Sequence, residues 1–210
     1  AVLARKEPQP GYPTVLLYAH HDVQPTGDIA LWTSPPFEAT VRDGRLYGRG
    51  SADDAAGIVT HYSALRALTE RVGPHPGLGV VLFIEGEEES GSPTFANLLQ
   101  AHHDSLSSDV IIVADSDNPA PDRPALTMSL RGVVGVSVRV RTLEAARHSG
   151  LFGGPIPDAL GVLTRLLSTC YHPDGSVAIE GLRGAHKDVA GVDEGDLRSE
   201  SGLLPGIDWW

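Results

Sequence analysis

The chain has 210 residues, of which 41% are hydrophobic, enough to bury the core of one large or two small domains. Its formal charge of −11 and isoelectric point near 5.1 argue against nucleic acid or an anionic membrane as the main partner. Its longest apolar runs have the length of strands, well short of the roughly 20 residues that a membrane-spanning helix needs, and no secretory signal pattern is expected at its start. The one cysteine, Cys170, allows no internal disulfide bond, which fits a cytoplasmic location.

A buried strand is predicted over residues 14–19, because Thr-Val-Leu-Leu-Tyr-Ala is short, apolar and rich in strand-forming residues. His20-His21-Asp22 follows at once. In such a triplet the histidine can bind a metal ion while the aspartate two residues later orients its ring. A single triplet of this kind also fits an ordinary structural role, so both interpretations stay open at this point.

A helix is predicted over residues 55–72, after a hairpin that turns at Asp43-Gly44 and a loop rich in glycine. Asp53 and Asp54 stand directly before it, where an aspartate can cap a helix or bind a metal ion. His61 and His75 have no comparable context and are expected at the surface. Five apolar residues at helical spacing predict the buried face of this helix: Ile58, Tyr62, Leu65, Leu68 and Val72.

An acidic run, residues 85–92, follows a second predicted buried strand at residues 79–84. Three consecutive glutamates, residues 87–89, repel one another and need compensation from solvent and counterions, a basic neighbour or a bound metal ion. Taken alone, such a charge run usually lies in a solvated loop. Residues 93–103 are then predicted to form a helix.

A third buried strand is predicted over residues 110–114, and it continues into Asp115 and Asp117. Three strands thus end in residue types that bind metals, and the helices between them favour parallel crossover connections. Ligands bind beyond the carboxyl ends of parallel strands. The sequence therefore predicts that the histidine and carboxylates converge at one edge of a parallel sheet.

The pattern changes after about residue 124. Valines alternate with small or basic residues over residues 134–140, which predicts an antiparallel strand with one face in water. A glycine-rich loop at residues 148–154 and a helix at residues 157–168 follow. We expect two domains, 1–124 and 125–210, the second of an α+β type.

Several ordered motifs resemble the dinuclear zinc peptidases of the carnosinase, carboxypeptidase G and aminoacylase family, with the dipeptidase branch as the closest. They are residues 19–25, Trp32 with residues 35–37, and residues 43–54, 85–92, 114–116 and 148–150. The resemblance implies an α/β fold, in which a catalytic domain with a mostly parallel sheet flanked by helices carries part of an inserted α+β lid or dimerisation domain. It implies two zinc ions per complete active site, with manganese or cobalt as alternatives, and a homodimer formed through the lid.

The resemblance also implies the metal ligands. His20 and Asp115 would bind the first zinc ion, with Asp117 a less favoured substitute for Asp115. Asp53 would bridge both ions, and Glu89 would bind the second.

The same resemblance implies three residues that act beside the metal ions. Glu88 would be the general base, taking a proton from the attacking water. Asp22 would orient the histidine that binds the first ion. His148 would reach an active site from the lid, often that of the partner subunit, and stabilise the oxyanion.

Two departures from the family pattern stand out. Ala55 and Ala56 occupy positions where a lysine usually follows the aspartate pair. Family members also extend beyond both ends of this chain, and the part after the lid supplies the last zinc histidine. The histidines that follow His148 in this chain, His172 and His186, do not lie in the family's motif for that ligand. Apparent truncation at both ends would leave the second zinc ion only Asp53 and Glu89, fewer than the usual three protein ligands.

Two classes of function therefore stay open. The first is a hydrolase acting on dipeptides, or on N-acyl-amino acids as a related amidohydrolase. The second is a truncated, non-catalytic, metal-binding remnant. We expect this chain by itself to have weak or no activity.

Overall fold

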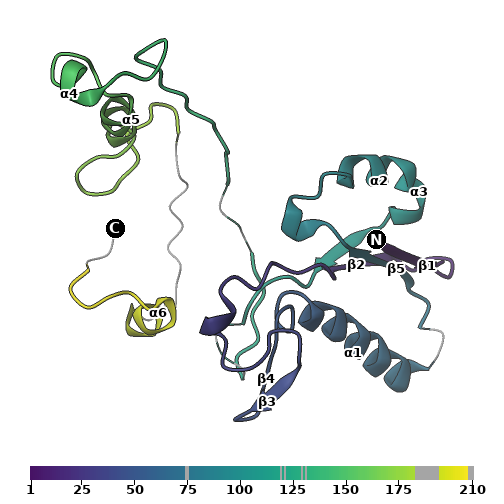
Figure 1. Cartoon of the computed structure of the whole chain (residues 1–210). Helices are drawn as coiled ribbons and strands as arrows, with labels where there is room; N and C mark the ends of the chain where they lie inside the picture. Colours follow the sequence, from purple (N-terminus) through teal and green to yellow (C-terminus); the bar gives the residue numbers. More distant parts are fainter. Residues whose placement is uncertain are drawn as a thin grey trace. The chain divides into compact units, whose positions relative to one another are not determined.

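The computed structural model describes residues 1–73, 76–118, 120, 122–128, 130, 132–182 and 194–207. Contacts within the chain define two compact units, residues 1–130 and 131–210, both drawn in Figure 1. The first unit holds a mixed sheet with helices on both faces, so the predicted α/β fold is confirmed. The catalytic and lid domains expected over 1–124 and 125–210 stay a prediction.

A four-stranded sheet with the order β1-β5-β2-β6 forms the centre of the first unit. Its inner strand β2 (Thr14–His20) runs parallel to both β5 (Gly79–Glu85) and β6 (Val110–Val113), as the sequence predicts. The predicted burial of the third strand is wrong for this structure, because β6 is an edge strand and all four of its residues are exposed. The antiparallel strand β1 (Val2–Lys6) pairs with β5 at the other edge. The sequence did not predict β1, because this strand is largely exposed and lacks a continuous apolar run.

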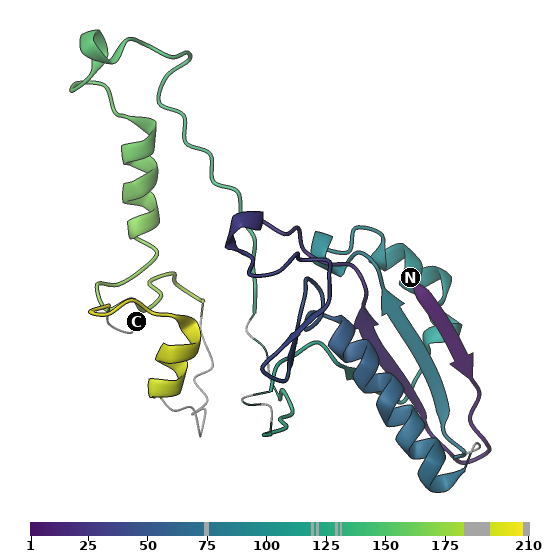
Figure 2. The ribbon, with the colours of Figure 1, turned by 60° about the horizontal axis from the view of Figure 1, so that its bottom comes forward.

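Helices cover both faces of this sheet. Helix α1 (Ala55–Val72) has the predicted bounds and lies along one face, while α2 (Phe95–Ala101) and α3 (His103–Leu106) lie on the other. The single helix predicted over residues 93–103 is thus two shorter ones. Figure 2 shows α1 running along the strands. On the α2 and α3 side, the core consists of Leu16, Val81, Phe83 and Leu106, with Phe95 and Leu98 packed against them.

A two-stranded hairpin and two short 3-10 turns complete the first unit. Strands β3 (Thr40–Arg42) and β4 (Arg45–Tyr47) pair around the predicted Asp43-Gly44 turn, where both residues have positive φ angles of 49° and 75°. That combination is typical of a two-residue hairpin turn. The 3-10 turns are η1 (Ile29–Leu31) and η2 (Glu88–Ser90), and η2 follows β5 closely.

The second unit contains α4 (Ser149–Phe152), α5 (Ala159–Ser168) and α6 (Glu194–Ser201). Helix α5 confirms most of the predicted helix at residues 157–168, and the predicted glycine loop contains one helical turn, α4. The strand predicted over residues 134–140 is wrong for this structure, since these residues pair with no strand in the described part of the chain. A strand needs a neighbour to satisfy its backbone groups, and alternation alone does not supply one.

No helix in the described part of the chain is both long and apolar enough to cross a bilayer.

Candidate metal centre

The ends of three chain segments bring the candidate metal ligands to one edge of the sheet. His20 is the last residue of β2 and stands opposite Glu85 in the parallel register with β5. Asp115 follows β6 by two residues, and Asp53 directly precedes the residue that caps α1. The carboxyl edge of a parallel sheet is the usual place for a ligand site in α/β folds.

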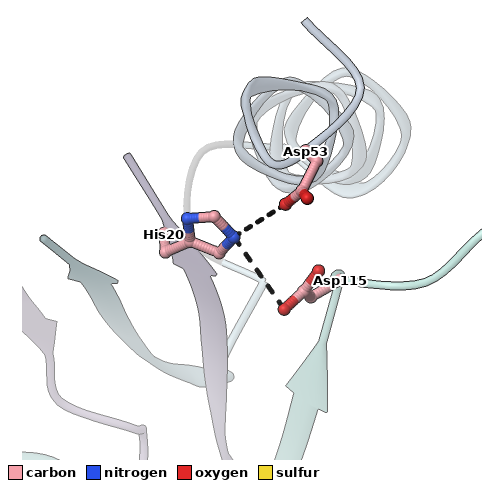
Figure 3. A group of neighbouring side chains, drawn as sticks. All are labelled: His20, Asp53 and Asp115. Carbon is pink, nitrogen blue, oxygen red and sulfur yellow. Dashed lines mark hydrogen bonds and ion pairs between the residues drawn. The ribbon is translucent and has the colours of Figure 1, made fainter. Parts of the chain in front are cut away.

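His20, Asp53 and Asp115 point toward one another (Figure 3). The Nε2 atom of His20 lies 2.9 Å from Asp53 Oδ1 and 4.0 Å from Asp115 Oδ2. One ligand atom from each of the three residues lies within 4.8 Å of the others. The His20 imidazole is almost fully buried, whereas the Asp53 side chain is 64% exposed. The group is therefore closed to solvent at His20 and open to solvent at Asp53.

This group fits a divalent metal ion. One imidazole nitrogen and two carboxylates form a donor set that suits zinc, and the same donors suit manganese and cobalt. Two adjacent carboxylates without a cation between them would repel, which raises the pKa of a carboxyl group. Burial, followed by nearby carboxylates such as Asp53, does raise the pKa of Asp115 here, against the opposing effect of His20. A cation between these groups would relieve that repulsion.

Asp22 links the histidine to the acidic turn after β5. The Nδ1 atom of His20 lies 3.0 Å from the backbone oxygen of Asp22 and 3.4 Å from its Oδ1 atom. With a proton on Nδ1, the Nε2 lone pair faces Asp53 and is free for a metal ion. The two Asp22 carboxylate oxygens accept the backbone N–H groups of Glu88 and Glu89 at 3.2 and 2.9 Å.

Burial and the neighbouring groups shift the pKa values of His20 and Glu88. Burial is the largest influence and lowers the pKa of His20, but hydrogen bonds to the Asp22 backbone and Asp53, together with the charges of Asp115 and Asp54, raise it, so the net shift is upward. Burial is the largest cause that raises the pKa of Glu88; His20 opposes it, and Asp115 adds to it. Glu88 Oε2 lies 4.0 Å from His20 Nε2 with its side chain 40% exposed. A carboxylate with a raised pKa beside a ligand group suits a general base.

Glu89 and Asp117 lie outside the group of three ligands. The Glu89 carboxylate instead accepts a hydrogen bond of 2.7 Å from Gln24 Nε2, and that amide also bonds to the Glu89 backbone oxygen at 3.1 Å. The second zinc site predicted at Asp53 and Glu89, and with it the role of Glu89, stays a prediction.

His148 belongs to the second unit. Its Nδ1 atom accepts the Gly150 N–H at 3.1 Å and so caps α4. Its predicted role with the oxyanion also stays a prediction.

The prediction that His61 lies at the surface is wrong. Only 3% of this residue is exposed, and its Nε2 atom lies 2.8 Å from the backbone oxygen of Tyr18 on β2. Tyr62 and Val72, also predicted to lie on the buried face of this helix, are 65% and 55% exposed, so this part of the prediction is wrong. The buried residues of α1 are Gly57 and His61, and Leu65, one turn further on, is partly buried; this spacing of four residues was the signal available in the sequence. His75, also expected at the surface, lies outside the described residues.

The sequence left Asp54 among several capping or ligand candidates, but its position is distinct. It caps α1 and is 2% exposed. Ala55 and Ala56, at the positions of the family lysine, are exposed in the first turn of α1.

A cavity of about 750 Å³ adjoins the ligands. Asp53, Asp54 and Asp115 line it together with Gly57 and residues 111–114. This volume lies within the range of about 300–1,000 Å³ that is typical of small-molecule sites.

Curated relatives include dipeptidases. The chain is 38% identical over 213 residues to the cysteinylglycine-S-conjugate dipeptidase of Corynebacterium striatum, covering 98% of this chain and 45% of that protein. It is 31% identical over 197 residues to the β-Ala-His dipeptidase of Mus musculus, covering 93% of this chain and 39% of that protein. The chain thus spans less than half the length of these two relatives.

Solved structures with the same fold include an M20 family metallo-carboxypeptidase from Sulfolobus solfataricus. Its TM-score is 0.76 at 23% identity, over 99% of this chain and 48% of that one. The di-peptidase Dug1p from Saccharomyces cerevisiae has a TM-score of 0.62 at 26% identity, over 99% of this chain and 42% of that one.

The family model that describes peptidase family M20/M25/M40 matches residues 16–192, more than half of the chain. This match spans all the candidate metal ligands. It also includes Glu88 and His148. The chain belongs to peptidase family M20/M25/M40.

Proposed function

We propose that this chain carries the metal-binding part of a metal-dependent dipeptidase, which hydrolyses the peptide bond of dipeptides or short peptides. The observation that carries the proposal is the convergence of His20, Asp53 and Asp115 within 4.8 Å. The Oε2 atom of Glu88 lies 4.0 Å from the Nε2 atom of His20, and the pKa of Glu88 is raised. The candidate ligands and the general base therefore come from different segments of the chain yet lie close together.

Two zinc ions complete the proposed site. His20 and Asp115 would hold the first ion, Asp53 would serve both, and Glu89 would contribute to the second. Bound metal ions of this kind lower the pKa of a water molecule toward neutrality and polarise the scissile carbonyl. Manganese or cobalt would suit the same nitrogen and oxygen ligands.

The protein side chains move and hold protons around this centre. Glu88 accepts the proton of the attacking water and passes it to the leaving amine. Asp22 keeps the His20 ring in place through Nδ1 and holds the backbone of the Glu88 turn. His148 is proposed to stabilise the oxyanion, an interaction typically worth about 3 kcal/mol.

The names of the relatives support dipeptides as the substrate class. One relative is named for cysteinylglycine S-conjugates and another for β-Ala-His, so both act on short two-residue substrates by name. The cavity beside Asp53 and Asp115 is large enough for a molecule of that size.

We further propose a cytoplasmic location and a homodimer formed through residues 125–210. The single cysteine, Cys170, supports the first, because a protein without disulfides tolerates a reducing compartment. Sedimentation analysis of the purified chain tests the second.

Zinc content tests the metal site. After stripping and reloading, elemental analysis of wild-type protein should give close to one zinc ion per chain, because one group of three ligands is preformed. Asp115→Asn should lower zinc binding, since an amide is a weaker ligand than a carboxylate. The matched control, Asp117→Asn, should retain it, because Asp117 lies outside the ligand group.

Other outcomes would overturn specific parts of the proposal. A folded protein that binds no zinc would contradict the metal site itself. A content close to two would mean that the second site is better furnished than Asp53 and Glu89 suggest. Loss of zinc in Asp117→Asn but not in Asp115→Asn would show that Asp117, and not Asp115, is the ligand of the first zinc ion.

A further inference from the structure

We propose that Asp54 is the positioning residue of the metal centre. Its carboxylate joins the backbone of His20 to the first turn of α1 and thereby sets the spacing of the three candidate ligands. The inference rests on the proposed function, because it presupposes a metal ion held by His20, Asp53 and Asp115.

Both oxygens of the Asp54 carboxylate are engaged. Oδ2 accepts the backbone N–H of His20 at 3.1 Å, and Oδ1 accepts the backbone N–H of Gly57 at 3.0 Å. Asp54 is 2% exposed, so water does not compete for these bonds. Because both partners are donors, an asparagine could satisfy only one of them and would turn its NH₂ group toward the other. A carboxylate is therefore the group that this position requires.

The first turn of α1, which Asp54 caps, contacts the segments that carry all three candidate ligands. Asp53 is its neighbour in the chain, and His20 is held through the backbone bond. Gly57 lies so close to the Ala114 backbone oxygen that no Cβ atom would fit between them, and Ala114 directly precedes Asp115. A shift of Asp54 would thus be transmitted to His20, Asp53 and Asp115.

Helix α5 shows what capping alone requires. Asp158 caps it, and its Oδ2 atom accepts the Gly161 N–H at 2.8 Å, the same aspartate-to-glycine spacing as in α1. Asp158 lies at an exposed position, and capping uses one of its oxygens. Burial and the second bond, to His20, are what Asp54 adds, and these serve the metal ligand rather than the helix.

The test compares Asp54→Asn with the matched control Asp158→Asn in the whole 210-residue chain. Cobalt(II) serves as the probe, with affinity measured by titration and ligand geometry by visible absorption. We expect Asp54→Asn to bind cobalt about 10- to 100-fold more weakly and with an altered absorption spectrum, as for other residues that orient metal ligands. Asp158→Asn should bind as the wild type does. Asparagine caps helices as well as aspartate does, so the helix content of both variants should be retained.

The outcomes separate this inference from the proposed function. If the wild type binds no cobalt or zinc, the proposed metal site fails, and the inference fails with it. If the wild type binds and Asp54→Asn binds equally well with an unchanged spectrum, only the positioning role is overturned.

A measurement on the wild type decides the question if Asp54→Asn does not fold. Hydrogen exchange of the His20 and Gly57 amides, both bonded to Asp54, should slow together when zinc binds, by about 10-fold or more. Zinc binding that leaves both exchange rates unchanged would overturn the inference.

Discussion

Each of the three consecutive glutamates after β5 has a different partner. Glu87 accepts hydrogen bonds from the Thr94 backbone N–H and hydroxyl at 3.1 and 2.6 Å. Glu89 accepts from Gln24. Glu88 alone among the three faces His20, and burial is the main cause that raises its pKa. Three identical side chains in a row therefore have three separate environments, and only one suits a general base.

Glu88→Gln should abolish peptide hydrolysis while leaving metal binding intact. Glutamine has nearly the same shape but cannot accept a proton from water, and general bases contribute about 10²- to 10⁴-fold to rate. The measurement is release of free amine from Cys-Gly or β-Ala-His at high protein concentration, together with zinc content.

The neighbouring variant Glu87→Gln is the control. The Glu87 carboxylate accepts a hydrogen bond from the Thr94 backbone N–H and does not face His20, so hydrolysis should continue at the wild-type rate. Equal loss in both variants, or loss of zinc in Glu88→Gln, would contradict the assignment of Glu88 as the base.

At the scale of elements, the close approach of α1 to the end of β6 decides the geometry of the site. Gly57 makes this approach feasible, because a methyl group there would overlap the Ala114 backbone oxygen and the Asp54 carboxylate. Four residues further on, His61 fixes the same helix to β2 through the Tyr18 backbone oxygen. The helix is thus attached to two strands whose ends carry candidate metal ligands.

Gly57→Ala should destabilise the protein by about 2 kcal/mol, although alanine is normally the better helix former. The reason is overpacking, since the backbone of the sheet cannot move aside as a flexible side chain would. Chemical denaturation of the metal-free protein measures this change.

Gly161→Ala is the matched control in α5. A Cβ atom there meets only Asp158 Oδ2, at an ordinary contact distance of 3.7 Å. This substitution should therefore stabilise its helix by about 0.5–1 kcal/mol. A stabilising effect of Gly57→Ala as well would show that α1 has room to move.

At the scale of the whole molecule, the chain spans 45% and 39% of the two dipeptidases described above. Its three clustered candidate ligands make up one candidate site for a metal ion. For the proposed second ion, the chain offers Asp53 and Glu89, and catalytic zinc sites usually have three protein ligands. The proposed two-metal mechanism therefore requires a second site for which this chain offers fewer ligands than for the first.

We accordingly expect the 210-residue chain to hydrolyse dipeptides weakly or not at all, with any activity abolished by a chelator and restored by zinc. Hydrolysis of Cys-Gly with and without added zinc measures this. A chelator-sensitive turnover near the enzyme median of about 10 s⁻¹ would show that the chain is sufficient for catalysis.

The sequence by itself predicted the elements that carry the candidate site. Short apolar runs before His20, Glu85 and Asp115 specify parallel strands, and the bounds of α1 follow from its capping aspartates and helical spacing. Because parallel strands align their carboxyl ends, the convergence of His20 with Asp115 was predictable from the residues that follow the predicted strands. These are local patterns combined with one general rule of topology.

Only the tertiary structure decided which side chains meet. It separated Glu88 from Glu87 and Glu89, buried His61 against β2, and gave Asp54 its second bond, to His20. It also left the alternating valines of residues 134–140 without a strand partner in the described part of the chain. Each of these outcomes depends on atoms far apart in the sequence, whereas periodicity and capping report only on neighbours within a turn or a strand.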